Sequence, residues 1–282
     1  MAISNFIPTI WSETLATALD QRYIAVSNCN RSYEGEIREK GSVVKICGVG
    51  SVTVGDYTKN TDMTAPQALS DTVAELAINQ AKYFNFQIDD IDRAQCSPKL
   101  MSEAMRVAAS ALAQTADRYV FGLYAQAGST IKATVTASNI LDQLIAARTA
   151  LYTQGVSDMS DVVIEVAPQI AELILKAKID IAKDNGEALE AGCLGSVGGC
   201  KIFVSPNVAT EEDKTNKVMY YKCLARTKRA VAFAEQLSEI NAYRPEKRFA
   251  DAVKGLHLYG AKTVYPNEMV LLNLGIAQSS AS

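Results

Sequence analysis

Two stretches of alternating apolar and polar residues, followed by a long helical repeat, constrain this chain more than any other feature. The first stretch runs from Val43 to Tyr57 and the second from about Asp71 to Ile88. Alternation at every second residue predicts half-buried strands, so the two stretches should form a long two-stranded arm. A hairpin alone in water buries too little surface to be stable, and the sequence offers no obvious lid for it. We therefore expect a neighbouring copy of the chain to support the arm, which favours assembly over catalysis.

The residues expected to make this assembly contact are apolar positions on the arm and on a short amphipathic N-terminal segment. They are Val43, Ile46, Leu76, Ile78, Phe84, Phe86, Trp11 and Leu15. Replacing Phe84 and Phe86 by serine should then impair assembly more than folding. The glycines at 48 and 50 indicate a bend or bulge in the first strand.

A long helix is predicted to begin at Ser97 and Pro98, because a capping oxygen followed by a residue without an amide hydrogen favours a helix start. Its apolar stripe, at spacings of four and three, is Met101, Met105, Ala108, Leu112, Thr115 and Tyr119. The pattern continues to Gly128, a natural stop, which gives a rod of roughly 45 Å at 1.5 Å per residue. Ala109 should lie on the opposite face.

Beyond Gly128 the pattern changes to alternating helices and strands. Asn139 should cap a helix that Gly155 ends, and Pro168 should open another helix directly after a buried strand at Val162–Val166. A short strand is expected at Lys201–Val204. Further β structure is expected at Tyr220–Ala234, Leu237–Tyr243 and Val253–Val264. Strands beside helices in this order predict a mixed α+β fold.

Composition limits the functional classes. The net charge of −3 and the isoelectric point of about 5.4 give no electrostatic basis for broad nucleic-acid binding. No segment has the pattern of a signal peptide or the ~18 consecutive apolar residues of a membrane helix. The six cysteines are scattered without a C-x-x-C pair, so we expect them to stay unpaired in a reducing, cytosolic environment.

The sequence predicts no catalytic, cofactor-binding or metal site. The glycine-rich segment 192–199 lacks the spacing of a phosphate-binding loop, and a strand follows it where a helix is needed. Three aspartates at 89, 90 and 92 are explained by the dipole of the following helix rather than by a metal. His257 is the only histidine, so no serine triad can be assembled and its role should be structural. The basic residues Arg226, Lys228 and Arg229 fit solvated faces or ion pairs between subunits better than a nucleic-acid contact.

The order of these parts resembles that of tailed-bacteriophage major capsid proteins. The resemblance rests on the Gly-Asp-Tyr turn at 55–57, the Phe-Gln-Ile-Asp-Asp-Ile-Asp-Arg-Ala-Gln passage at 86–95, the long helix and Val163-Ile-Glu-Val-Ala-Pro. It continues with Arg248-Phe-Ala-Asp and Leu258-Tyr-Gly-Ala-Lys-Thr-Val-Tyr-Pro, and it extends from about Phe6 to Val270. Each motif alone is weak, whereas their order is specific.

The resemblance implies an HK97-like fold. Its parts would be an N-terminal arm at 1–32, an extended E-loop region at 33–88 and a P-domain spine-helix region at 89–129. An A-domain would follow at 130–236, and residues 237–282 would return to the P-domain and the C-terminus.

The family also implies that copies form pentamers and hexamers of an icosahedral shell around double-stranded DNA, which is packaged without sequence specificity. Portal, decoration and separate scaffolding proteins would be further partners, and no membrane would be involved. The protein would be located in the virion and assembled in the host cytoplasm. The alternatives are an encapsulin shell around an enzyme cargo and, from a different class, a small α/β enzyme.

Overall fold

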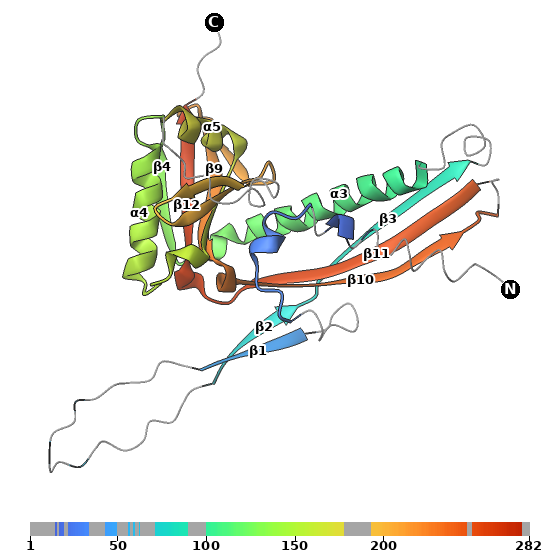
Figure 1. The fold of residues 1–282 in the computed structure, drawn as a ribbon, viewed down its shortest axis with the longest axis horizontal. Helices are drawn as coiled ribbons and strands as arrows, with labels where there is room; N and C mark the ends of the chain where they lie inside the picture. The colour runs from blue at the N-terminus through green and yellow to red at the C-terminus, as the bar shows by residue number, and fades with distance from the viewer. Residues whose placement is uncertain are drawn as a thin grey trace, which may run out of the picture.

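The computed structural model describes residues 15, 17–19, 22–33, 43–49, 56, 59, 62, 71–89, 100–177, 193–246 and 250–277. Among these residues, two bodies meet at one junction, and a pair of strands leaves the sheet of the elongated body near that junction (Figure 1). The elongated body carries the long helix, and the rounder body carries a large mixed sheet with two helices.

The elongated body is a three-stranded antiparallel sheet with one long helix along one of its faces (Figure 1). Its strands, in sheet order, are β10 (Val231–Tyr243), β11 (Ala250–Thr263) and β3 (Gln80–Asp89). The helix α3 (Leu100–Phe121) continues as the 3-10 turn η4 (Gly122–Gln126). The predicted rod is therefore confirmed over 22 residues, while its extension as α-helix to Gly128 is wrong. Ser97 and Pro98 lie outside the described residues.

Small residues widen the buried face of α3 beyond the predicted stripe. The fully or almost fully buried apolar positions among its described side chains are Met105, Ala109, Leu112, Ala113, Ala116, Val120 and Phe121. Ala109 thus lies on the buried face, and its predicted place on the opposite face is wrong. Alanines here let other backbone segments approach the helix closely, because they add little beyond the helix radius.

The rounder body contains a seven-stranded mixed sheet in the order β4-β12-β9-β5-β7-β6, in which β8 also pairs with β9. Its strands are β4 (Ser129–Thr134), β5 (Val162–Val166), β6 (Cys193–Val197), β7 (Cys200–Val204), β8 (Thr210–Asp213), β9 (Val218–Thr227) and β12 (Met269–Ala277). Helix α4 (Ile140–Thr153) packs against β4, β9 and β12 and contacts α5 (Pro168–Lys176).

Local sequence signals explain the helices of this body. Asn139 accepts a hydrogen bond from the N–H of Thr136 at the start of α4, and Gly155 takes the left-handed backbone conformation (φ +92°) just after its end. Pro168 opens α5 directly after β5, all of whose residues are buried. The positions of both helices are confirmed, although the side chain of Asn139 makes no capping hydrogen bond to α4. Strands β4 and β12 were not predicted. Strand β12 lies beside β9 and β4, so residues 237–282 do not all return to the elongated body.

The arm differs from the predicted hairpin. Strand β1 (Val43–Val49) pairs with β2 (Asp71–Ala77) in continuous antiparallel register, so the bulge expected at Gly48 is absent from this ladder. The second predicted stretch is two strands, because the chain leaves β2 after Ala77 and β3 then pairs with β11. Only β1 and β2 therefore form the hairpin, and β3 belongs to the elongated body.

The base of the arm is supported by its own chain. Val44, Ile46, Leu76 and Ile78 are buried in one cluster. The rest of that cluster comes from β10 and β11: Ala232, Ala234 and Leu258. The expectation that the arm has no lid within the chain is therefore wrong for its base. The lid was missed because β10 and β11 carry apolar side chains on both faces, one toward α3 and the other toward the arm.

Gly260 on β11 is where the arm base approaches most closely, because a Cβ atom there would lie 2.3 Å from the carbonyl oxygen of Ala77. We expect Gly260→Ala to displace the arm base and to lower the free energy of unfolding by about 1–3 kcal/mol. The matched control is Gly122→Ala, whose Cβ meets nothing within 4 Å. Urea unfolding checks the difference, and equal midpoints for the two variants would contradict this packing.

Candidate functional site

The junction between the two bodies is where the chain passes from one body to the other. The chain crosses it three times, from α3 to β4, from β9 to β10 through η6 (Lys228–Ala230), and from β11 to β12 through η7 (Pro266–Glu268). The N–H of Gly128 donates to the carbonyl oxygen of Pro266 (2.8 Å), and a Cβ at Gly128 would lie 2.6 Å from that oxygen. Glycine is therefore required where the first and third crossings touch.

A short N-terminal segment, Ile24–Arg31, lies across this junction, and we call it the strap. It contains one 3-10 turn, η2 (Val26–Asn28). At its end Asn30 pairs in parallel with the start of β10: its N–H donates to Val231 O and its carbonyl oxygen accepts from Phe233 N–H, both at 2.9 Å. The strap is thus joined to the sheet of the elongated body by backbone hydrogen bonds.

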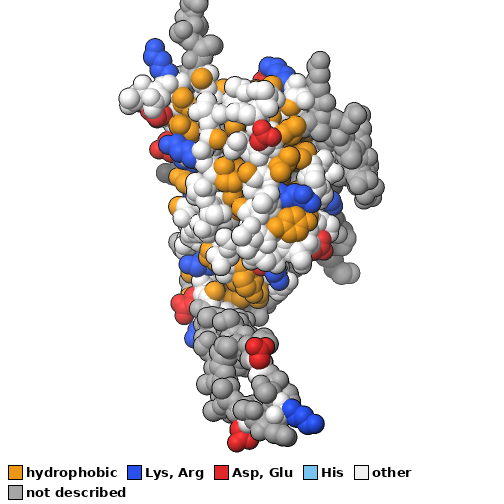
Figure 2. Space-filling view, turned by 90° about the vertical axis from the view of Figure 1, so that its left-hand side faces the viewer, with side chains coloured by type: hydrophobic (Ala, Val, Ile, Leu, Met, Phe, Trp, Pro, Cys, Tyr) orange, Lys and Arg blue, Asp and Glu red, His pale blue; other side chains and the backbone are white. Residues whose placement is uncertain are grey.

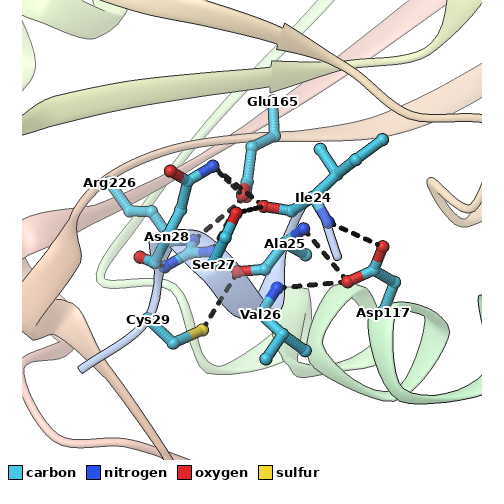
Figure 3. Close-up of polar contacts among 9 residues, drawn as sticks. All are labelled: Ile24, Ala25, Val26, Ser27, Asn28, Cys29, Asp117, Glu165 and Arg226. Atoms are coloured by element: carbon cyan, nitrogen blue, oxygen red, sulfur yellow. Dashed lines mark hydrogen bonds and ion pairs between the residues drawn. The ribbon is translucent and has the colours of Figure 1, made fainter. Parts of the chain in front are cut away.

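Asp117 on α3 holds the beginning of the strap. Its carboxylate accepts hydrogen bonds from the backbone N–H groups of Ile24 (3.1 Å), Ala25 (3.0 Å) and Val26 (3.1 Å), as Figure 3 shows. Burial raises the pKa of Asp117 to about 6 despite these three donors. The group is therefore mostly ionised at neutral pH and satisfies N–H groups that the single turn of η2 cannot.

Arg226 on β9 holds carbonyl oxygens at both ends of the same turn. Its guanidinium donates to the carbonyl oxygens of Asn28 (2.7 Å) and Ala25 (2.9 Å) and makes a two-pronged pair with Glu165 on β5, at 3.0 and 2.9 Å (Figure 3). Both side chains are completely buried. Burial alone would lower the pKa of Arg226, but the charge of Glu165 outweighs it and raises that pKa. The interpretation of Arg226 as a solvated or intersubunit cation is wrong.

A third polar cluster joins the strap, and Tyr23 directly before it, to the sheet of the elongated body. Glu235 on β10 accepts from Tyr23 Oη (2.5 Å) and Arg31 Nη2 (2.7 Å), and its Oε2 lies 2.7 Å from His257 Nε2 on β11. Burial would raise the pKa of Glu235, but its hydrogen bond and charge interaction with His257, with help from Tyr23 and Arg31, lower it. His257 is therefore a buried member of a structural network.

The polar groups at this junction bind one another and so hold the parts of the chain together. Its carboxylates accept hydrogen bonds from backbone N–H, guanidinium, phenol and imidazole groups. Within the described part of the chain no group of three or more His, Cys, Asp and Glu side chains could hold a metal ion. Burial raises the pKa of the Cys29 thiol to about 11 and that of Cys223 to about 12, so both stay protonated at neutral pH. No described helix has the length and apolar character needed to cross a membrane.

The residues predicted for the assembly contact differ in their exposure to solvent. Val43 is 48% exposed, whereas Ile46, Leu76 and Ile78 belong to the buried arm base and Leu15 is buried in the main core. Phe84 and Phe86 stack on each other (6.0 Å between ring centres) and pack half-buried against that core. Their replacement should therefore affect folding as well as assembly. Trp11 lies outside the described residues.

Sequence reasoning missed two more exposed apolar side chains, Tyr83 on β3 (79% exposed) and Val107 on α3 (65%). Tyr83 and Phe84 are consecutive residues of β3, so their side chains lie on opposite faces of the strand. Apolar residues on both faces were the signal that could have revealed the exposed Tyr83. On the side of the molecule shown in Figure 2, apolar side chains are dispersed among polar ones. Helix α4 exposes Ile145 and Tyr152, and the guanidinium of Arg148 lies 5.0 Å from the centre of the Tyr152 ring.

Comparison with protein families decides the identity. The sequence pattern of a family described as phage capsid protein matches residues 71–271, from the arm base through both bodies to β12. The chain belongs to this family. Among curated proteins, none matches this capsid protein.

Solved structures agree with the family. A structure from Mycobacterium phage Che8 superposes on this capsid protein with a TM-score of 0.69 at 28% identity, covering 89% of this chain and 91% of that one. The capsid structure of the cyanophage P-SCSP1u gives a TM-score of 0.68 at 17% identity, covering 91% and 89%. A virus-like particle from Pyrococcus furiosus gives 0.56 at 11% identity, covering 93% and 96%. The predicted HK97-like fold is confirmed, and the protein is a phage major capsid protein.

Proposed function

We propose that this major capsid protein assembles through pentamers and hexamers into a closed icosahedral shell around packaged double-stranded DNA. The supporting observation is that the capsid family pattern covers residues 71–271 and therefore spans both bodies and the junction. Contact with DNA would be independent of sequence, as the net charge of −3 gives no broad attraction to phosphate. Scaffolding, portal and decoration proteins would be separate partners, and assembly would take place in the host cytoplasm.

We propose further that the protein acts by its shape and not as an enzyme. Its buried charged groups at the junction are used in holding the strap, since Asp117, Glu165 and Arg226 all have partners within the chain. Catalytic groups need an accessible reacting atom near them. These three side chains are almost fully buried, and their partners are structural groups of the same chain.

The second candidate is an encapsulin-type shell enclosing an enzyme cargo. The observation behind it is the likeness to the virus-like particle from Pyrococcus furiosus. That likeness has a lower TM-score than the two phage structures, and at 11% identity it carries the fold alone. The contents of particles purified after phage infection separate the candidates, because a genome supports the capsid function and a copurifying enzyme supports the alternative.

The domain boundaries and contact surfaces belong to the same proposal. We assign the N-terminal arm to 1–32, the E-loop region to 33–88, the spine-helix region to 89–129, the A-domain to 130–236 and the remainder to 237–282, with β3 at the end of the E-loop region pairing in the elongated body and β12 in the rounder body. Val43 and Tyr83 are exposed and would contact neighbouring subunits. The buried arm residues would act by holding the arm in the direction from which it reaches a neighbour.

Tyr83→Ser should abolish most closed shells in negative-stain electron microscopy while leaving the thermal midpoint of the subunit nearly unchanged, because an exposed side chain contributes little to folding. The matched variant is Phe84→Ser at the next position, which should lower the midpoint because Phe84 packs against the core. Normal shells from Tyr83→Ser would remove this residue from the contact surface.

A further inference from the structure

We propose that the strap, Ile24–Arg31, is a lock that fixes the angle between the elongated body and the rounder body of each subunit. Asp117 is on the elongated body and Arg226 is on the rounder body. Both grip the same turn of the strap. A subunit with a docked strap then has one shape, and a subunit with a free strap can flex at the junction. The proposed lock acts within one subunit, so it does not depend on which other proteins bind the shell.

The grip at each end of the turn uses the backbone of the strap. Asp117 accepts from three N–H groups at the beginning of the turn, and Arg226 donates to the carbonyl oxygens of Ala25 at its beginning and Asn28 at its end (Figure 3). A negative group at the N-terminal side of a helical turn and a positive group at its C-terminal side both match the direction of the backbone dipoles. The two bodies therefore hold the same turn, the elongated body through its N–H groups and the rounder body through its carbonyl oxygens.

Release of the strap would leave costly groups behind. Asp117 would lose three donors and Arg226 would lose two acceptors, and both side chains are almost fully buried when the strap is docked. Buried polar groups without partners are unfavourable, and a buried ion pair is weak as a stabiliser but well suited to specify one arrangement. The docked state is thus defined by a few directional contacts that either form together or fail together.

Three chain crossings and one shared hydrophobic core join the two bodies. The crossings touch through backbone hydrogen bonds among Gly128, Pro266, Ala230 and Val264. Two packed bodies can still move against each other at such a junction by small hinge or shear displacements. The strap adds contacts on both sides of this hinge, to Asp117 and Glu235 of one body and to Glu165 and Arg226 of the other.

Two variants should open the lock in the full-length, unassembled subunit. In Asp117→Asn, one of the carboxylate oxygens becomes an NH₂ group that faces a backbone donor. In the double variant Glu165→Met with Arg226→Met, the buried pair is replaced by apolar side chains and the grip on Ala25 and Asn28 is removed. The matched control is Arg106→Met, which breaks an exposed ion pair with Glu103 on the same helix as Asp117.

The readouts are hydrogen exchange of the amides of Ile24–Val26 and the distance between spin labels placed by Val107→Cys and Leu175→Cys, one on each body. The labels are added in a background with Cys47 and Cys96 replaced by serine. We expect one narrow distance in the parent and the control. Both lock variants should show a broadened distribution and at least tenfold faster strap exchange. Faster strap exchange with an unchanged narrow distance would overturn the lock, and so would unchanged strap exchange.

The parent protein tests the proposal even if neither variant folds. Its strap amides at Ile24–Val26 should exchange as slowly as those of the paired strands β5 and β9. Exchange as fast as that of the exposed turn at Asp213–Asn216 would show that the strap is not held, and would overturn the proposal.

Discussion

Replacing Arg226 by methionine is expected to cost about 3–5 kcal/mol of unfolding free energy, the usual penalty for removing one partner of a buried ion pair. Glu165 would remain as a carboxylate with no exposure to water and only Asn28 as a side-chain donor at 3.3 Å. The carbonyl oxygens of Ala25 and Asn28 would lose their guanidinium donor in the same step. This is a large fraction of the stability of a typical domain.

Urea unfolding of the purified subunit measures this loss, and the double variant Glu165→Met with Arg226→Met serves as its control. The double variant should recover much of the stability, because apolar side chains of similar volume often replace a buried pair at little cost. If the single and double variants unfold at the same urea concentration, the loss of stability does not come from the unpaired charge of Glu165, which would contradict this prediction.

A proline at Val107 is expected to be the second most damaging change. Val107 lies eight residues into α3, so proline removes a backbone hydrogen bond and its ring clashes with the preceding turn, at a cost of ~3 kcal/mol or more. The side chain of Val107 is largely exposed, so little of the effect comes from lost packing. This position isolates helix continuity better than Ala109, whose burial would add overpacking to the backbone defect.

Circular dichroism and negative-stain microscopy of the same sample measure the effect, with Val107→Ala as the control. Val107→Pro should lower the thermal midpoint and yield few closed shells, because a kink in α3 would displace the helix from the sheet it packs on and would misplace the strap contact at Asp117. Val107→Ala should behave like the parent. Closed shells of normal form from Val107→Pro would show that shell geometry does not depend on a straight α3.

The strongly periodic parts of the fold were predictable. Helix α4 follows from apolar residues at helical spacing between Asn139 and Gly155, and α5 follows from Pro168 after a run of buried β-branched residues. The buried face of α3 is wider than the predicted apolar stripe, because alanines such as Ala109 and Ala113 carry little apolar signal yet are completely buried. Strand β12 is continuously buried, so it lacks the alternation that reveals a half-exposed strand.

The junction could not be predicted, because its contacts join residues far apart in the sequence. Arg226 contacts a backbone oxygen 201 residues away, and its neighbours Lys228 and Arg229 gave it the appearance of a surface cluster. Nothing local distinguishes Asp117 from other polar residues on α3, since its partners are backbone N–H groups 91–93 positions earlier. The arm base was missed for the same reason, because its lid comes from β10 and β11.

Cryo-electron microscopy of the chain, expressed together with the other head proteins of its phage and then purified, tests most directly whether this protein builds a capsid shell. We predict closed icosahedral particles made of pentamers and hexamers, in which each subunit has the two bodies described here and the strap lies across their junction. Val43 and Tyr83 should face a neighbouring subunit in these particles. A protein that remains a monomer at every concentration, or that forms only open and irregular aggregates, would contradict assembly as its function.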